Sequence, residues 1–258
     1  MLLLLPLHLL ACGQAIHGPD PSAWDQVVVA TLGDAQVVDA RSPADWAAGH
    51  VPGAAHLNWT EVETFDADGL WGVPPVAEVA ALLGARGIAA ERPVVVYGGG
   101  PEGWGDDGNL YWTLRYAGHG DVRVLDGGWL GWLAAGGVPA TADDAPGAIA
   151  FDAEPDLSVL ADTEDVAAWS GVLLDVRSES EWDEGHIPGA TWFPWDSVYG
   201  DDGTLRDPDD VAARLEAVGA TPGVPLATRL RALISSSPIM QFSGFKQRVT
   251  TCLASTTR

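Results

Sequence analysis

The chain has 258 residues, a formal net charge of −23 at pH 7, 47% hydrophobic residues and 12 tryptophans. This hydrophobic content predicts a folded protein rather than a disordered one, and the length suits two domains of about 100–150 residues. The negative charge argues against nucleic acid as a partner, because a phosphate backbone is neutralised by Lys and Arg.

The chain begins with MLLLLPLHLLACGQ, which predicts a signal peptide or lipoprotein-like leader in residues 1–21. The apolar run Leu2 to Ala11 is too short to span a bilayer as a helix but suits a signal-peptide core. Leu9-Leu10-Ala11-Cys12 resembles a lipoprotein cleavage box, so we expect lipidation of Cys12 and a periplasmic or membrane-anchored protein. No Lys or Arg precedes the run, which leaves a cytoplasmic location open.

An internal repeat organises the rest of the chain. Residues 37–59 and 173–195 align without gaps at an offset of 136, with ten of 23 positions identical. The identical positions of the first copy are Asp39, Arg41, Ser42, Trp46, Gly49, His50, Pro52, Gly53, Ala54 and Trp59. The repeat predicts two homologous domains, at residues 22–140 and 157–226.

Each copy predicts the same local structure. A short apolar strand ends at Asp-x-Arg-Ser. Ser42 or Ser178 then caps a short helix that carries the repeated tryptophan, Trp46 or Trp182. Gly-His-x-Pro-Gly-Ala then predicts a turn into the next strand. We expect His50 and His186 to be structural hydrogen-bonding groups.

The first copy continues with alternating helices and strands. VAEVAALLGARGI and NLYWTLRYAGHG have helical spacing, whereas RPVVVYG reads as a buried strand. VRVLDGGWLGWLAAGGVP predicts a strand, a tight turn and a short helix. This alternation predicts an α/β fold in which a parallel sheet is flanked by helices. The segment 141–156, rich in Ala, Asp, Pro and Gly, is the predicted linker.

These motifs, in this order and twice over, resemble the rhodanese family in its two-domain sulfurtransferase form. The resemblance covers about residues 22 to 226. It implies two tandem rhodanese-like domains, the second incomplete here, and transfer of sulfane sulfur from thiosulfate or 3-mercaptopyruvate to cyanide or a thiol. It also implies a cysteine persulfide, in a loop whose backbone N–H groups lower the thiol pKa. No cofactor and no metal are implied.

The loop that would hold this cysteine has no nucleophile in the first copy. After Tyr97 the sequence reads GGGPEGWGDDG, without Cys, Ser or Thr. Glu102, Asp106 and Asp107 would repel an anionic donor, which is typical of the non-catalytic first copy in tandem members. Cation binding by these acids is the alternative.

In the second copy the cysteine is expected at position 230, but the chain has a leucine there, Leu230. This follows from aligning VAALLGARGIAAERPVVVYG with VAARLEAVGATPGVPLATRL, which matches Gly98 with Leu230. Cys252 lies in VTTCLAST without a preceding strand or glycine loop, so we do not expect it to substitute. The sequence therefore predicts no catalytic cysteine.

The arginine and aspartates of the repeated motif, and three tryptophans, also have predicted roles. Arg177 follows the second Asp-x-Arg strand and corresponds to an arginine that faces the substrate anion in active relatives, so it is the candidate substrate-binding residue. A structural ion pair is the alternative, since Arg41 has the same place in the first copy. We expect Asp39 and Asp175 to accept hydrogen bonds from nearby backbone N–H groups. Three tryptophans are expected to pack in the core: Trp112, Trp129 and Trp132.

The composition changes where the family pattern stops. Residues 227–258 contain no acidic residue, although the chain has 36, and they contain the only lysine, Lys246. A shifted reading frame or a wrong gene join would explain this unmatched basic tail, and a natural divergent tail is the alternative. Two functions follow: a sulfurtransferase lineage that is inactive as written, or a non-catalytic binding or scaffold module anchored at a membrane.

Overall fold

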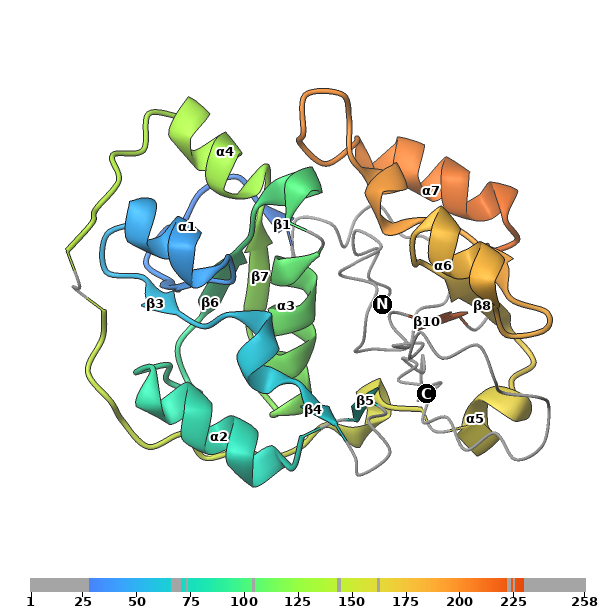
Figure 1. Ribbon diagram of the computed structural model, residues 1–258, viewed down its shortest axis with the longest axis horizontal. Helices are drawn as coiled ribbons and strands as arrows, with labels where there is room; N and C mark the ends of the chain where they lie inside the picture. Colours follow the sequence, from blue (N-terminus) through green and yellow to red (C-terminus); the bar gives the residue numbers. More distant parts are fainter. Residues whose placement is uncertain are drawn as a thin grey trace.

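The computed structural model describes residues 28–65, 71–72, 74–103, 105–142, 145–161, 163–221, 224 and 226–229. Two α/β units follow one another along the chain (Figure 1). The expectations for Cys12, Leu230 and Cys252 lie outside the described residues, as do the leader and nearly all of the tail. Within the described part of the chain, no helix has the length and apolar character needed to cross a bilayer.

The strands of the first unit are β1 (Val28–Val29), β2 (Gln36–Asp39), β3 (Ala55–His56), β4 (Thr64–Phe65), β5 (Trp71–Gly72), β6 (Val94–Tyr97) and β7 (Val122–Leu125). Its helices are α1 (Pro43–Ala48), α2 (Val76–Ala85), α3 (Asp106–Tyr116) and α4 (Gly128–Ala134), with short 3-10 turns at η2 (Trp59–Val62) and η3 (Gly100–Glu102). The second unit contains η4 (Leu157–Val159), α5 (Thr163–Ala167), β8 (Val172–Asp175), α6 (Glu179–Glu184), β9 (Thr191–Trp192), η5 (Trp195–Val198), α7 (Pro208–Ala217) and β10 (Leu226–Arg229).

The first unit is built on a five-stranded sheet with the order β1-β7-β6-β2-β3, and every neighbouring pair is parallel. Alternation along β6 divides its side chains between two faces, since successive residues of a strand point to opposite sides. Val94 and Val96 pack into the core under α2 and α3, whereas Val95 and Tyr97 pack into a smaller core beside Trp46 of α1 and the tryptophans of α4. The sheet is therefore covered on both faces, as the sequence predicts.

The second unit has a three-stranded parallel sheet with the order β10-β8-β9 among the described residues. Its buried side chains continue the core of the first unit, and Val159, Leu174 and Leu215 belong to the same cluster as Leu110. Hydrogen bonds also join the two units: the Trp112 indole donates to the Val159 carbonyl at 3.3 Å. The two units therefore share one continuous core.

The predicted linker is packed along the first unit, as its path around α2 shows (Figure 1). The Ile149 N–H donates to the Gly84 carbonyl at 2.9 Å, and a Cβ at Gly84 would lie 2.5 Å from the Ile149 carbonyl oxygen. A Cβ at Gly118 would lie 2.0 Å from the carbonyl oxygen of Glu154. These glycines are therefore required by close backbone contact, which the linker composition alone did not indicate.

Candidate functional site

The end of the first repeat strand is held by a buried ion pair. Both oxygens of Asp39 accept from Arg41: Oδ1 from the backbone N–H at 2.9 Å and from Nε at 3.0 Å, and Oδ2 from Nη2 at 2.7 Å. Asp175 and Arg177 repeat this arrangement at 3.2, 2.8 and 2.7 Å. The expectation that these aspartates accept from nearby backbone N–H groups is confirmed.

Each arginine also fixes the turn that follows the short helix. Nη2 of Arg41 donates to the Gly49 carbonyl at 2.7 Å, and Nη2 of Arg177 donates to the Gly185 carbonyl at 2.8 Å. The structural ion pair considered for Arg177 is therefore present. Nη1 of Arg177, however, is buried without a hydrogen-bond partner among the described residues. One guanidinium nitrogen thus remains for a further acceptor.

The serine caps and the histidines behave as the sequence predicts. The Ser42 hydroxyl accepts from the Asp45 N–H at 3.1 Å, and Ser178 forms a capping box with Glu181. The His50 ring stacks on Trp46 with 3.5 Å between ring centroids and bonds through Nε2 to the Ala142 carbonyl at 3.1 Å. His50 therefore ties the start of the linker to the first unit.

The place of the missing nucleophile follows from the register of β10. In the first sheet Asp39 pairs with Tyr97, and in the second sheet Asp175 pairs with Arg229. Arg229 thus takes the register position of Tyr97. Gly98 follows Tyr97 in the first unit, and Leu230 follows Arg229 in the second. The register supports the sequence alignment that places the family cysteine at position 230.

A side chain at the start of the corresponding loop in the first unit would make a tight contact with α3. A Cβ at Gly98 would lie 3.1 Å from the Asp107 nitrogen and 3.2 Å from its Cβ. The Gly98 carbonyl accepts from the Trp129 N–H at 3.0 Å, which fixes the loop against α4. A side chain at Gly98, where the family resemblance implies a cysteine, would therefore require the start of α3 to shift by a few tenths of an ångström.

A cavity of about 460 Å³ lies beside this loop. The lining residues come from the ends of β2, β3, β6 and β7 and from the helices that follow them: Arg41, Ser42, Asp45, Asn58, Trp59, Gly99, Glu102, Gly103, Asp106, Trp129 and Leu130. The Arg41 guanidinium lies over the Trp129 ring, 4.0 Å from its centroid. The expectation that Trp129 packs only in the core is therefore incomplete, because this residue also lines the cavity.

The three acids of the loop have different environments. Glu102 is exposed, and Asp107 is buried and accepts from the Gly108 N–H at 2.8 Å. Asp106 is half-buried in the cavity, where burial and the negative charges of Asp107, Asp39 and Asp45 raise its pKa to about 8. At neutral pH the Asp106 carboxyl is therefore largely protonated.

We expect Asp106→Asn to stabilise the protein, with a larger effect at higher pH. The unfolded carboxyl ionises near pH 4 and the folded one near pH 8, so unfolding releases a proton between these values and stability falls as the pH rises. The variant should raise Tm by about 3 °C or more at pH 8.5 and by less than half of that at pH 5. Thermal unfolding by circular dichroism, with the exposed-site variant Glu91→Gln as control, measures both. Equal Tm values for Asp106→Asn and the parent at pH 8.5 would refute the shifted pKa.

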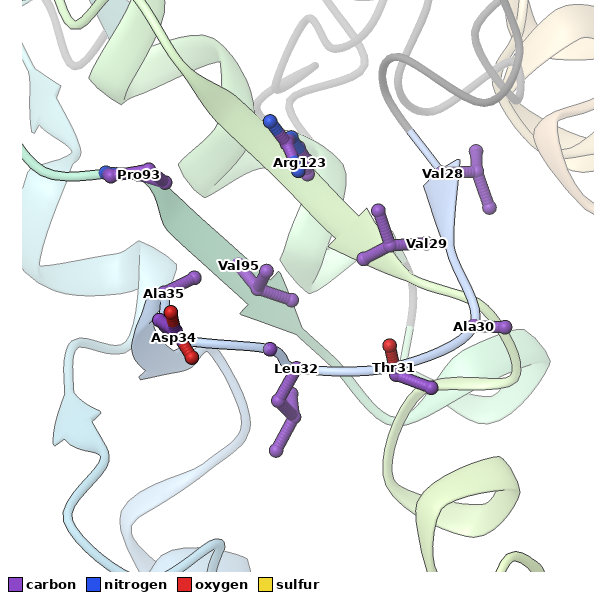
Figure 2. Close-up of a pocket in the computed structure, with 11 residues that line it drawn as sticks. Val28, Val29, Ala30, Thr31, Leu32, Asp34, Ala35, Pro93, Val95 and Arg123 are labelled. Atoms are coloured by element: carbon purple, nitrogen blue, oxygen red, sulfur yellow. The ribbon is translucent and has the colours of Figure 1, made fainter.

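A larger hollow, of about 610 Å³, lies between the 30–35 loop and the strands β6 and β7 (Figure 2). Most of the residues that line it are aliphatic, among them Val29, Leu32 and Val95. Arg123 at its edge is already bonded to Asp121, with 2.9 Å between Nε and Oδ1. This hollow lacks the convergent polar groups of the smaller cavity, so it is not the candidate site.

Comparison with known proteins agrees with the two-unit fold. The rhodanese-like domain model matches residues 26–135 and 156–221. A thiosulfate sulfurtransferase of Azotobacter vinelandii is 33% identical over 207 residues, which cover 74% of this chain and 74% of that protein. A relative from Mycolicibacterium smegmatis is 32% identical over 190 residues, covering 64% of this chain and 65% of that protein, so less than two thirds of its length is matched.

A solved structure shows the same fold. The 3-mercaptopyruvate sulfurtransferase SseA of Escherichia coli superposes with a TM-score of 0.62 at 24% identity, over 74% of this chain and 79% of that one. Together, the twofold match of the domain model, the relatives and the repeated Asp-x-Arg strand end assign the chain to one family. The chain belongs to the rhodanese family, as a tandem of two rhodanese-like domains.

Proposed function

We propose that the chain is of sulfurtransferase lineage and keeps one arginine of the substrate site, but that, as written, it lacks the nucleophile. In the proposed ancestral reaction a cysteine thiolate attacks the outer sulfur of thiosulfate. The S–S bond breaks, sulfite leaves with the bonding electron pair, and the cysteine holds a persulfide. Cyanide or a thiol then takes the outer sulfur and regenerates the thiolate. Thiosulfate and 3-mercaptopyruvate are the candidate donors.

The observation that carries this proposal is the matched register of β10 and β6. Because Asp175 pairs with Arg229, the loop position after the strand is Leu230, and a leucine side chain cannot form a persulfide. Arg177 supports the lineage. Its guanidinium is buried and fixed by Asp175, yet Nη1 has no hydrogen-bond partner among the described residues, so its N–H groups are available to donate to a substrate anion.

The experiment that tests this proposal compares two repairs of the second domain. One replaces residues 227–258 with the corresponding segment of the Azotobacter protein, and the other changes Leu230→Cys alone. We expect thiocyanate formation only from the first, since the thiolate also needs the loop N–H groups and the following helix. Activity of Leu230→Cys alone would contradict the need for the whole loop.

The second candidate function is a non-catalytic binding or scaffold module. The first unit favours it, because its loop has a glycine, Gly98, in close contact with Asp107 and carries acids in place of a nucleophile. The DNA downstream of codon 226 distinguishes the two candidates. A cysteine-containing glycine loop in another reading frame supports the sulfurtransferase, and its absence from every frame supports the module.

We also propose that Cys12 is a lipid anchor, on the basis of the sequence Leu9-Leu10-Ala11-Cys12. Expression in a bacterium supplied with labelled palmitate should label the parent protein and leave Cys12→Ser unlabelled, because the acyl chains attach at this cysteine. Cys252→Ser is the matched control and should keep the label. Label that persists in Cys12→Ser, or its absence from the parent, would rule out this anchor.

A further inference from the structure

The cavity of the first unit lies where parallel α/β sheets bind ligands. Its walls come from the segments that follow β2, β3, β6 and β7, so it lies at the carboxyl ends of four parallel strands. Crevices outside these strand ends are the usual ligand sites of open α/β sheets. The volume of about 460 Å³ is also within the common range for small molecules.

The charged groups in this cavity favour a cation. The lining includes one guanidinium, that of Arg41, and three carboxyl groups: Asp45, Glu102 and Asp106. Arg41 is occupied by Asp39, by the Gly49 carbonyl and by the Trp129 ring. Its charge is therefore largely balanced before any ligand enters.

Asp106 is the carboxyl group that remains available. Asp45 is bonded to the Ser42 hydroxyl, whereas the Asp106 side chain forms no hydrogen bond or ion pair with another described residue. Asp106 is half-buried and lines the cavity beside Gly103. A positively charged donor entering the cavity would thus find an acceptor without a competing partner.

The remaining walls are suited to an apolar stem. Trp59, Trp129 and Leu130 also line the cavity, and one face of the Trp129 ring is covered by the Arg41 guanidinium, 4.0 Å from the ring centroid. Aromatic faces attract ammonium groups and also bury methylene groups. Within the described residues, no group of three or more His, Cys, Asp or Glu side chains is placed to hold a metal ion. The walls therefore fit an organic cation better than a metal ion.

We propose that this cavity binds a small primary alkylammonium, with the ammonium group at the Asp106 carboxylate and the alkyl stem against Trp59, Trp129 and Leu130. The site belongs to the first unit, and the proposal does not depend on sulfur transfer by the second. It gives the first domain a ligand of opposite charge to thiosulfate.

Binding should be coupled to release of a proton. At pH 7 the Asp106 carboxyl is largely protonated, since burial and the neighbouring carboxylates raise its pKa to about 8. The ammonium ion pairs with the ionised form, so it must displace that proton. Affinity should therefore increase as the pH rises from 6.5 to 8.5, by about 25-fold for a single group that ionises near 8.

Isothermal titration calorimetry of the full chain with n-butylammonium chloride tests the site. Titrations at pH 6.5 and 8.5, in two buffers of different ionisation enthalpy, measure both the affinity and the number of protons released. n-Butanol, sodium butyrate and sodium thiosulfate at the same ionic strength are the ligand controls. We expect butylammonium to bind more tightly than all three and to release close to one proton at pH 7.

Two variants of the cavity and one control assign the binding to Asp106. Asp106→Asn should weaken butylammonium binding at least tenfold at pH 8.5 and remove its pH dependence. Glu102→Gln, at an exposed position, should weaken binding severalfold while keeping the pH dependence. Glu91→Gln, an exposed residue outside the cavity, should change neither, and thermal unfolding shows that each variant is folded.

Three outcomes would overturn the proposal. These are equal binding of n-butanol and n-butylammonium, unchanged affinity in Asp106→Asn, and no detectable butylammonium binding up to about 10 mM. Thiosulfate binding that is lost in an Arg41→Met variant would instead show an anion site in this cavity.

Discussion

The purified chain is expected to form thiocyanate from thiosulfate and cyanide no faster than the uncatalysed reaction. The reaction requires a thiolate that is held by backbone N–H groups, and the strand register leads to Leu230 at that position. Cys12 is the proposed lipid anchor, and Cys252 lies in VTTCLAST, a sequence that predicts neither the strand nor the glycine loop of the family. Anion binding at Arg177 alone cannot create a persulfide.

The size of this effect makes it easy to measure. Removing the nucleophile from a covalent mechanism lowers kcat by about 10⁶ in a well-studied protease, so an active relative and this chain should differ by several orders of magnitude. The Azotobacter vinelandii thiosulfate sulfurtransferase is the positive control. A double variant, Cys12→Ser with Cys252→Ser, should have the same background rate as the parent. Robust turnover by that double variant would refute a cysteine mechanism altogether.

Asp39→Ala is expected to lower the free energy of unfolding of the first domain by about 3–5 kcal/mol. Asp39 is fully buried, and the substitution would leave the Arg41 guanidinium, which is 5% exposed, without its counter-ion. The Tyr97 hydroxyl, which donates to Asp39 Oδ2, would lose its acceptor as well. Burial and the charge of Asp39 raise the pKa of Tyr97, so the phenol is a neutral donor over the whole practical pH range.

Urea unfolding measures this loss, and hydrogen exchange of the β2 and β6 amides assigns it to the first domain. Asp34→Ala is the matched control, because Asp34 is exposed and should change the free energy of unfolding by less than about 0.5 kcal/mol. Asp175→Ala removes the equivalent partner of Arg177 in the second domain and should leave the exchange of β2 and β6 nearly unchanged. A loss below about 1 kcal/mol for Asp39→Ala would contradict the role given to the pair.

Several features of the fold and site could be predicted because their causes are local. The Asp-x-Arg spacing places a carboxylate and a guanidinium two residues apart at a strand end, and the serine that follows caps the next helix. The continuous apolar run of β6 predicts a strand buried on both faces, as found. Repetition of these patterns then predicts two similar units.

Other features depend on contacts between distant segments and were not predicted. α3 begins at Asp106, three residues before the predicted start, because Gly105 has a φ of +78° and turns the chain into the helix. The Tyr97–Asp39 hydrogen bond and the stacking of Arg41 on Trp129 join residues that are far apart in sequence. No local pattern identified the cavity that they help to enclose, although the acids of the loop indicated its charge.

Mass spectrometry of the intact chain after incubation with thiosulfate tests the central claim most directly. The claim is that the second domain keeps Arg177 at its site but has no nucleophile at position 230. We predict no added sulfur on the parent protein, and one added sulfur on the loop cysteine of the chain with the Azotobacter segment. A stable persulfide at Cys252 of the parent, together with turnover that is lost in Cys252→Ser, would contradict the account.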